Sequence, residues 1–422
     1  MSIMHKEMFG INETLAKEIL EVALSTGGDF AEVYMEKTTN EVLRLHSGKL
    51  STANVSKVKG AAIRIIKGEL EVNSSITDCT YENLLKAAKT LAGSFNDKKH
   101  VEVQPFVEKK VELVVNPKNV RGNDISREVN LLKTASDTIY AYSKEIVQVI
   151  CNLTKTEKRI FVFASDSTWQ TDYRCNTRLS CQAVASDGKE METGFDSFGR
   201  NQGMEMFDDF DVVPFAKQVA HDAVEMLHAE PMQGGEMPVV INNGFGGVIL
   251  HEACVHGLEA TSVAKGMSVF CNKLGQKVAS DIVNAVDDGT NLNAWGSINV
   301  DDEGTPSKCN VLIENGILKS YLVDKRNSKK MNHPITGSSR RESYKYQTTS
   351  RMTNTYFLNG KSTFDEIIKS TEKGLFAEKM GGGSVNPATG EFNFAVQVGY
   401  MIENGKITKP VKGATLVGSG KD

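Results

Sequence analysis

The segment from residue 246 to residue 259 contains the residue types of a hydrolytic metal site. It reads GGVILHEACVHGLE, in which Glu252 directly follows His251 and His256 stands four residues after Glu252. Neutral imidazole nitrogens suit zinc, and an adjacent carboxylate that does not bind the metal can accept a proton from a water that attacks an amide carbonyl. We therefore predict that His251 and His256 bind zinc and that Glu252 is the general base of a peptidase.

The spacing of the two histidines predicts an unusual backbone. In the familiar HExxH motif the histidines are four residues apart and differ by about 40° around an α-helix, so both reach one ion. Here they are five residues apart, which on a regular helix gives about 140°. We predict a π-type wide turn that brings both rings to one side. The alternative is that the HExxxH match arose by chance. For a chain with so few histidines, we estimate the probability of such a match at on the order of one in a hundred.

A catalytic zinc site normally has three protein ligands, and the motif supplies two. Other residues have suitable side chains, and spacing does not choose among them: His221, His228, His333, Cys271 and Cys309. Glu259 either orients an imidazole of the site or is a solvated carboxylate on a helix face. Cys254 lies inside the motif, and because a helix would turn it away from one histidine, we predict that it is structurally buried.

Turn and cap signals predict the elements that position this motif. A strand at residues 237–241 precedes a glycine turn and a helix that begins near Gly247. Asn-Gly pairs at residues 315–316 and 404–405 indicate β-hairpins. A capping box from Thr363 to Glu366 begins a later helix, which we expect to end at Gly374.

The first half of the chain reads as helices packed on antiparallel strands. We predict a helix that follows its cap Asn12, and a polar connection at residues 108–122. Strands are predicted at 31–37, 40–46 and 60–66 and within 144–194, and helices at 81–91, at 125–142 and from Pro214 onward. The Pro and Gly residues at 231–235 mark a boundary. We predict an α+β fold of two domains, 1–230 and 231–422, each a largely antiparallel sheet with packed helices, with HExxxH on a helix of the second.

Composition and charge exclude several classes of function. The chain has 49 Lys and Arg against 53 Asp and Glu, so its net charge of -4 offers no excess of basic residues to a nucleic acid. Its longest apolar runs are strand-sized, far short of the ~20 residues that cross a bilayer, and we see no secretory signal. Seven cysteines without a CxxC pair indicate reduced thiols. We predict a cytoplasmic protein with neither nucleic acid nor membrane as a partner.

Three smaller clusters have two interpretations each. The glycines at residues 381–383 either let a peptide backbone approach or form a tight turn. Four basic residues either bind a peptide carboxylate or form a solvated face: Arg340, Arg341, Lys345 and Arg351. The acidic run Asp301-Asp302-Glu303 lacks EF-hand spacing, and we expect an exposed turn rather than a cation site.

Three long segments resemble the TldD branch of the TldD/PmbA family. They are HEACVHGLEA, the stretch from Ser338 to Gly360, and the stretch from Lys379 to Gly420. The resemblance covers essentially the whole chain. It implies a zinc-dependent peptidase for small or unfolded peptides, in which the substrate aligns like an added strand in an enclosed cavity. By this resemblance His251 and His256 bind zinc, Glu252 is the general base, and the partner is a TldE/PmbA-type subunit that lacks the motif.

The resemblance also implies a further ligand, a cysteine in a glycine-rich segment beyond a GATL strand. That strand corresponds here to Gly413–Leu416, and no cysteine follows it before Asp422. Either the sequence is a truncated form or the protein lacks this ligand. The alternative function is therefore a non-catalytic peptide-binding or regulatory subunit of the same fold with an incomplete metal site. The dimer partner is either a TldE/PmbA-type subunit or a second copy of the chain.

Overall fold

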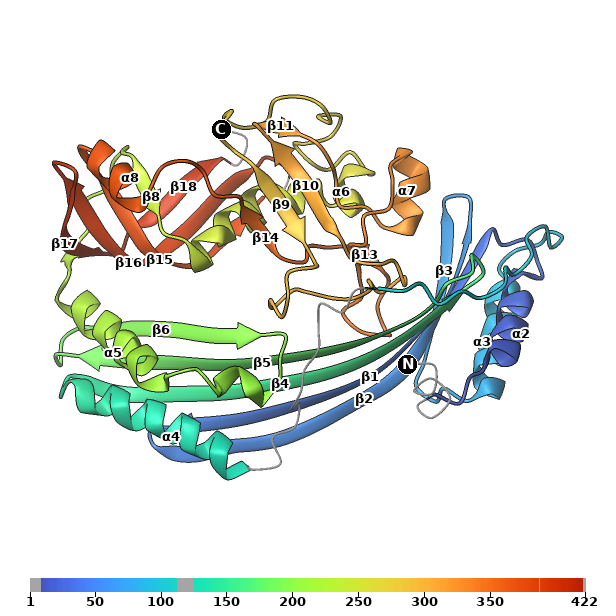
Figure 1. The fold of residues 1–422 in the computed structure, drawn as a ribbon, viewed down its shortest axis with the longest axis horizontal. Helices are drawn as coiled ribbons and strands as arrows, with labels where there is room; N and C mark the ends of the chain where they lie inside the picture. Colours follow the sequence, from blue (N-terminus) through green and yellow to red (C-terminus); the bar gives the residue numbers. More distant parts are fainter. Residues whose placement is uncertain (1–8, 112–124, 387, 420–422) are drawn as a thin grey trace.

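One long antiparallel sheet organises the first half of the chain in the computed structural model, which describes residues 9–111, 125–386 and 388–419. The strand order is β3-β2-β1-β4-β5-β6. The strands are β1 (Phe30–His46), β2 (Lys49–Lys67), β3 (Leu70–Ile76), β4 (Ile146–Ala164), β5 (Trp169–Ser186) and β6 (Met191–Arg200). Figure 1 shows these strands curving beneath the second half of the molecule. The predicted strands 31–37 and 40–46 are one strand, because β1 pairs with β2 and β4 along both segments.

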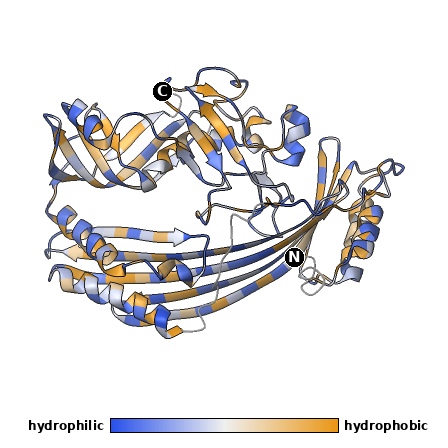
Figure 2. Cartoon of the chain, in the orientation of Figure 1, coloured by the Kyte–Doolittle hydropathy of each residue, from blue (hydrophilic) through white to orange (hydrophobic). Residues whose placement is uncertain are grey.

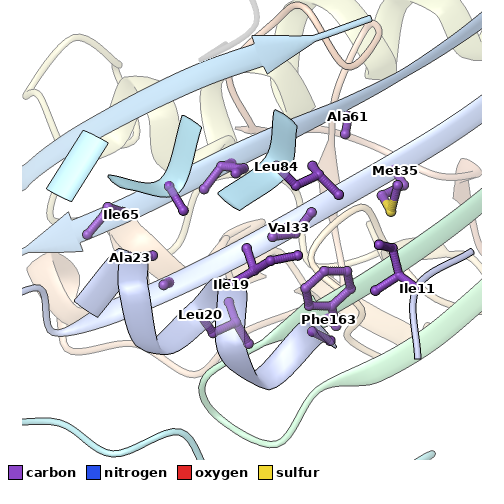
Figure 3. Packing of buried hydrophobic residues seen from close by; sticks show 14 of the residues in the cluster. Ile11, Ile19, Leu20, Ala23, Val33, Met35, Ala61, Ile65, Leu84 and Phe163 are labelled. Carbon is purple, nitrogen blue, oxygen red and sulfur yellow. The ribbon is translucent and has the colours of Figure 1, made fainter. Parts of the chain in front are cut away.

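Helices cover the two ends of this sheet and build two separate cores. In Figure 1, α2 (Glu13–Leu24) and α3 (Tyr81–Ala92) pack at one end, and α4 (Ile125–Tyr142) and α5 (Val212–His228) at the other. Figure 3 shows Ile19 of α2 beside Val33 of β1; full burial of one such side chain stabilises the fold by about 1.5–3 kcal/mol.

The helix predictions for this half are confirmed. Asn12 caps α2, since its side chain accepts a hydrogen bond of 3.0 Å from the Leu15 N–H. Figure 2 shows hydrophobic and hydrophilic residues alternating along each helix, which is the amphipathic pattern on which the predictions rested. Most of the predicted connection at 108–122 lies outside the described residues. No helix in the described ranges has the length and apolar character needed to span a bilayer.

The second half contains three smaller sheets. Their orders are β11-β10-β9-β14, β12-β13 and β7-β17-β16-β15-β8, with β18 paired to β16. The strands are β7 (Glu230–Pro231), β8 (Val239–Ile241), β9 (Ala285–Asp288), β10 (Cys309–Glu314), β11 (Ile317–Leu318), β12 (Ser339–Arg340), β13 (Thr349–Ser350), β14 (Thr355–Phe357), β15 (Lys373–Val385), β16 (Glu391–Glu403), β17 (Lys406–Lys412) and β18 (Thr415–Ser419). The β8–β15 and β7–β17 pairs are parallel and the others are antiparallel. The predicted α+β class with largely antiparallel sheets is confirmed.

The turn signals of this half are confirmed with one exception. Asn315-Gly316 and Asn404-Gly405 both have positive φ and connect β10 to β11 and β16 to β17. The capping box of Thr363 and Glu366 begins α8 (Phe364–Ser370). The expectation that Gly374 ends this helix is wrong. Gly374 lies in β15, where an added Cβ would stand 2.6 Å from the carbonyl oxygen of Pro238, the residue just before β8. Glycine therefore permits the close approach of β15 to this segment.

Asp301-Asp302-Glu303 is not an exposed turn, which corrects the expectation from sequence. All three residues are fully buried. Asp302 and Glu303 pair with arginines of the long sheet, and Asp301 accepts hydrogen bonds from three backbone N–H groups, those of Glu303, Thr305 and Ser339. We call the ion-paired group at this place the charged junction: Glu32, Arg64, Arg174, Asp302, Glu303 and Arg341. Arg64 Nη2 lies 2.6 Å from Glu303 Oε1, and Arg174 Nη1 lies 2.9 Å from Asp302 Oδ1. The charged junction therefore joins the two halves of the molecule.

Candidate metal centre

The backbone of the HExxxH segment has the wide turn that the histidine spacing predicted. A 3-10 turn at Gly244–Gly247 leads into a π-helix at Leu250–Cys254, followed by a 3-10 turn at Val255–Leu258. The apolar residues of the segment anchor it to the core. Leu250, Val255 and Leu258 are all buried together with β10 and the chain around Leu322.

The wide turn brings the three predicted site residues together. We call His251, Glu252 and His256 the HEH cluster; one possible ligand atom from each lies within 4.8 Å of those of the other two. The imidazole ring centres are 4.8 Å apart and the rings are nearly perpendicular, at 85°. The Glu252 carboxylate lies 4.0 Å from Nε2 of His251 and 3.6 Å from Nε2 of His256. Both rings and the carboxylate therefore face a shared space.

The HEH cluster is half-buried and open on one side. The side chain of His251 is 39% exposed, that of Glu252 32% and that of His256 17%. Burial lowers the pKa of His251, and the neighbouring His256 lowers it further. A neutral imidazole keeps a lone pair available for a metal ion, so this environment favours ligation over protonation.

Glu259 orients one ring of the HEH cluster. Its Oε1 atom lies 3.1 Å from Nδ1 of His256, which leaves Nε2 facing Glu252. The Glu259 carboxylate is itself held, because Arg351 Nη1 lies 3.7 Å from the same oxygen. Of the two interpretations of Glu259, the structure supports the orienting one. A carboxylate behind a ligating histidine fixes the tautomer of the ring and raises its basicity.

Gly257 allows the chain to turn inward directly after His256. An added Cβ there would lie 2.7 Å from the Phe270 ring, so a larger residue would displace a buried aromatic side chain. Cys254 is half-buried, and burial raises the pKa of its thiol to about 12. It is therefore a neutral residue packed against the core, although it is only partly buried where we predicted burial.

The five further ligand candidates lie away from the HEH cluster. Among the described residues, no fourth His, Cys, Asp or Glu groups with its three members. His221 contacts Tyr142 and Glu225, and His228 contacts Glu145, so both make polar contacts at the surface of α5. His333 lies beside Tyr321, and the thiol of Cys271 donates to the Val263 carbonyl. Cys309 is an exposed residue of β10.

The donor set of the HEH cluster fits a divalent metal of the zinc type. Two imidazole nitrogens facing a common space, with a carboxylate alongside and one side open, are the components of a hydrolytic site. His251 and His256 are the residues whose ring nitrogens would be available to such an ion. A bound ion would supply Lewis-acid chemistry, polarising a carbonyl group and making a water molecule more acidic.

The sequence did not reveal the link between Arg351 and the HEH cluster. Arg351 was noted only as one of four clustered cations, and its contact with Glu259 joins segments far apart in the chain. No local spacing encodes such a contact. The available signal was the pair of charges itself, an acid just after the motif and an arginine elsewhere.

A cavity of about 550 Å³ lies on the amino-terminal side of the motif. It is lined by the turn residues Phe245 and Gly246, by Lys379 and Gly381 of β15, and by Asp196 of β6. β8 pairs only with Leu375–Ala377 of β15, so the following residues of β15 have no partner on that side among the described strands. An open strand edge therefore borders this cavity.

Comparison with known proteins matches nearly the whole chain to one group. Three family models match it: PmbA/TldA metallopeptidase domain 1 at residues 31–94, the central domain at 118–227 and the C-terminal domain at 234–422. A metalloprotease TldD homolog of Haemophilus influenzae is 35% identical over 402 residues, covering 93% of this chain and 83% of that protein. A metalloprotease of Methanocaldococcus jannaschii is 29% identical over 97% of this chain and 90% of its own. The crystal structure of TldE from Thermococcus kodakarensis shares the fold, with a TM-score of 0.77 at 18% identity over 96% of this chain and 91% of its own.

Proposed function

The chain belongs to the PmbA/TldD family of metallopeptidases, and from this premise we propose that it is a zinc-dependent peptidase that cleaves small or unfolded peptides. The convergence of His251, Glu252 and His256 carries this proposal. In it His251 and His256 are the metal ligands and Glu252 is the general base.

The side chains of the HEH cluster divide the work of hydrolysis. Glu252 accepts a proton from the attacking water and passes it to the leaving amine, for which its half-exposed carboxylate between the two rings is well positioned. His256 keeps one orientation because Glu259 holds its far nitrogen. The low pKa of His251 keeps that ring neutral and able to bind the ion.

The open edge of β15 supports the proposed mode of substrate binding. A peptide that pairs with this edge would be held by its backbone amides, which every peptide has, and side-chain sequence would matter little. The residues of β15 past Ala377 border the cavity next to the motif. Gly381 and Gly382 leave room there for a second backbone.

We further propose that the protein works in the cytoplasm and assembles with a TldE/PmbA-type subunit or with a second copy. The likeness of its fold to TldE supports the assembly. Seven free cysteines, including Cys151 and Cys181 with sulfur atoms 3.1 Å apart, suit a reducing compartment. The division into domains 1–230 and 231–422 also stays a proposal, supported by family models that end at residue 227 and resume at 234.

The proposal is tested by measuring zinc content and peptide hydrolysis on the same preparation. We expect stoichiometric zinc, cleavage of an unstructured fluorogenic peptide, loss of cleavage on chelation and recovery when zinc is restored. His251→Ala should lose both zinc and cleavage. His228→Gln is the matched control, because His228 is an exposed histidine paired with Glu145 outside the HEH cluster. It should keep both.

The alternative is a non-catalytic peptide-binding or regulatory subunit with an incomplete metal site. Its signature is peptide binding without cleavage at any zinc concentration. That result would replace the peptidase proposal, whereas cleavage that follows zinc content would exclude the alternative.

A further inference from the structure

A second cavity, with basic side chains in its lining, lies near the segment that follows the HEH cluster. It has a volume of about 890 Å³, within the ~300–1,000 Å³ range of ligand sites, and is open to solvent. Four cations line it together with one acidic residue, Glu342: Arg340, Arg341, Lys345 and Arg351. Arg341 pairs with Glu32 and Arg351 lies near Glu259, so the excess positive charge of the lining comes from Arg340 and Lys345 against Glu342. This excess favours an anionic ligand.

The cavity is connected to the HEH cluster through Arg351. This residue lies in the wall of the cavity and 3.7 Å from Glu259, which holds His256. The strand that precedes it, β13, also contacts the segment after the motif, since the Ser350 N–H donates to the Thr261 hydroxyl. A ligand in this cavity would thus stand next to the residues that orient the site.

Arg340 is a cation without an acidic partner at contact distance among the described residues. One terminal nitrogen donates to the Ser339 carbonyl at 3.0 Å, and the other is buried with no hydrogen-bond partner. The acidic residues nearby are engaged by other groups: Asp302 pairs with Arg174, and Asp301 accepts three backbone N–H groups. Arg340 also lines the cavity, so its guanidinium group has donor capacity left for a ligand there.

The loop that carries these cations is fixed in place before any ligand arrives. Arg341 donates to Glu32 at 3.1 Å and to the Tyr346 carbonyl at 2.9 Å. Tyr344 lies against Gly60 of β2, where an added Cβ would stand 2.4 Å from its ring. Binding there would cost little ordering of the loop, which is the condition for a selective anion site.

The class of substrate suggests which anion this is. Unfolded peptides of any sequence share two features, the backbone amides and the chain ends. Arginine presents its donors in a planar fork that matches a carboxylate with two hydrogen bonds. Resting on the proposed function, we propose that this cavity is a subsite for the C-terminal carboxylate of the peptide substrate, bound by Arg340 and Lys345. The enzyme would then select peptides by the presence of a free C-terminus.

The test compares peptides of one unstructured sequence that end in a free carboxylate, in an amide, or in an amide after a terminal Glu. Their dissociation constants are measured on metal-loaded protein carrying Glu252→Gln, so that no peptide is consumed. We expect the free acid to bind about tenfold more tightly than either amide. Arg340→Gln and Lys345→Gln should each bring the acid to the level of the amides, and Arg340→Lys should restore part of the preference.

Two controls keep this test decisive. Arg127→Gln removes an exposed arginine of α4 that pairs with Asp208, and it should leave the preference unchanged. Lys345 is exposed, so Lys345→Gln reports on the subsite even where Arg340→Gln lowers stability.

Equal binding of acid and amide by the unaltered cavity would overturn the subsite, as would a preference that survives both Arg340→Gln and Lys345→Gln. Tight binding of the amide that ends in Glu would overturn the assignment to the chain end. The peptidase proposal is judged separately by cleavage. A preference for the free acid without any cleavage would support the subsite and refute the peptidase proposal. Cleavage without that preference would support the peptidase proposal and refute the subsite.

Discussion

Two groups of titratable residues, the HEH cluster and the charged junction, differ in how closely their members are paired and how deeply they are buried. In the charged junction each side chain is at least nine-tenths buried and has an ionic partner within 3.1 Å. In the HEH cluster the side chains are 17–39% exposed, and the carboxylate contacts are 3.6 Å and longer. Charges that are fully paired hold elements together, whereas charges that leave a side open can receive a ligand.

The largest expected effect separates activity from stability at the HEH cluster. Glu252→Gln keeps the shape of the side chain but removes the proton acceptor, so the hydrolysis rate should fall by about 10²- to 10⁴-fold. Zinc content and thermal midpoint should stay unchanged, as mass spectrometry and calorimetry can check. Glu314→Gln, at an exposed carboxylate paired with Lys319, is the control and should change neither property. Normal cleavage by Glu252→Gln would remove Glu252 from the mechanism.

The reverse outcome is expected at the charged junction. Arg64→Gln leaves Glu32 and Glu303 in a dry interior without their shared cation, which should lower the free energy of unfolding by about 3–5 kcal/mol. Chemical denaturation measures this loss. Lys17→Gln breaks an exposed pair with Glu21 and should cost less than about 0.5 kcal/mol. Similar losses in the two variants would show that the charged junction does not hold the halves together.

Neighbouring carboxyls of the charged junction should have opposite pH dependence. Burial, reinforced by Glu32, Asp324 and Asp301, outweighs Arg64 and raises the pKa of Glu303 from 4.5 to about 7. The folded protein then holds a proton that the unfolded chain has lost, so the free energy of unfolding falls as pH rises from about 4.5 to about 7, by on the order of 3 kcal/mol.

Asp302 should have the opposite effect on the pH dependence of stability, because its pKa is lowered. Burial alone would raise its pKa, but Arg174, Lys158 and Arg340 lower the pKa from 3.8 to about 2, so its contribution is lost as pH falls through that range. In Glu303→Gln, the free energy of unfolding should no longer fall between about pH 4.5 and about pH 7. In Asp302→Asn, it should no longer fall as the pH drops below about 4. An unchanged pH dependence between about pH 4.5 and about pH 7 in Glu303→Gln would contradict the assignment.

The smallest expected effect concerns the carboxylate behind the HEH cluster. Glu259→Gln should weaken zinc binding roughly tenfold. This is the low end of the roughly 10- to 100-fold loss expected for a residue that hydrogen-bonds a metal ligand, because Arg351 already shares the charge of Glu259. Competition with a chelating dye measures the affinity. Glu145→Gln disrupts a comparable carboxylate–histidine pair at His228 and should leave zinc affinity unchanged. Equal affinities in Glu259→Gln and the parent would reduce Glu259 to a packing role.

Local patterns in the sequence were sufficient for the helices and the hairpins. Asn12 and the Asn-Gly pairs act within a few residues, so their geometry follows from short-range sterics and hydrogen bonding. The five-residue histidine spacing predicted the wide turn only through the assumption that both rings bind one ion. Contacts between distant segments could not be predicted in this way. The burial of Asp301-Asp302-Glu303 depends on Arg64 and Arg174, which lie more than a hundred residues earlier in the chain. A run of three acids resembles an exposed turn until its partners are known.

The proposed peptidase depends on the binding of one metal ion by both His251 and His256. Anomalous diffraction from crystals grown with zinc would locate that ion. We expect one strong zinc peak within coordination distance of both imidazoles, beside the Glu252 carboxylate. A fully occupied zinc ion bound elsewhere, with these two rings free of metal, would contradict it.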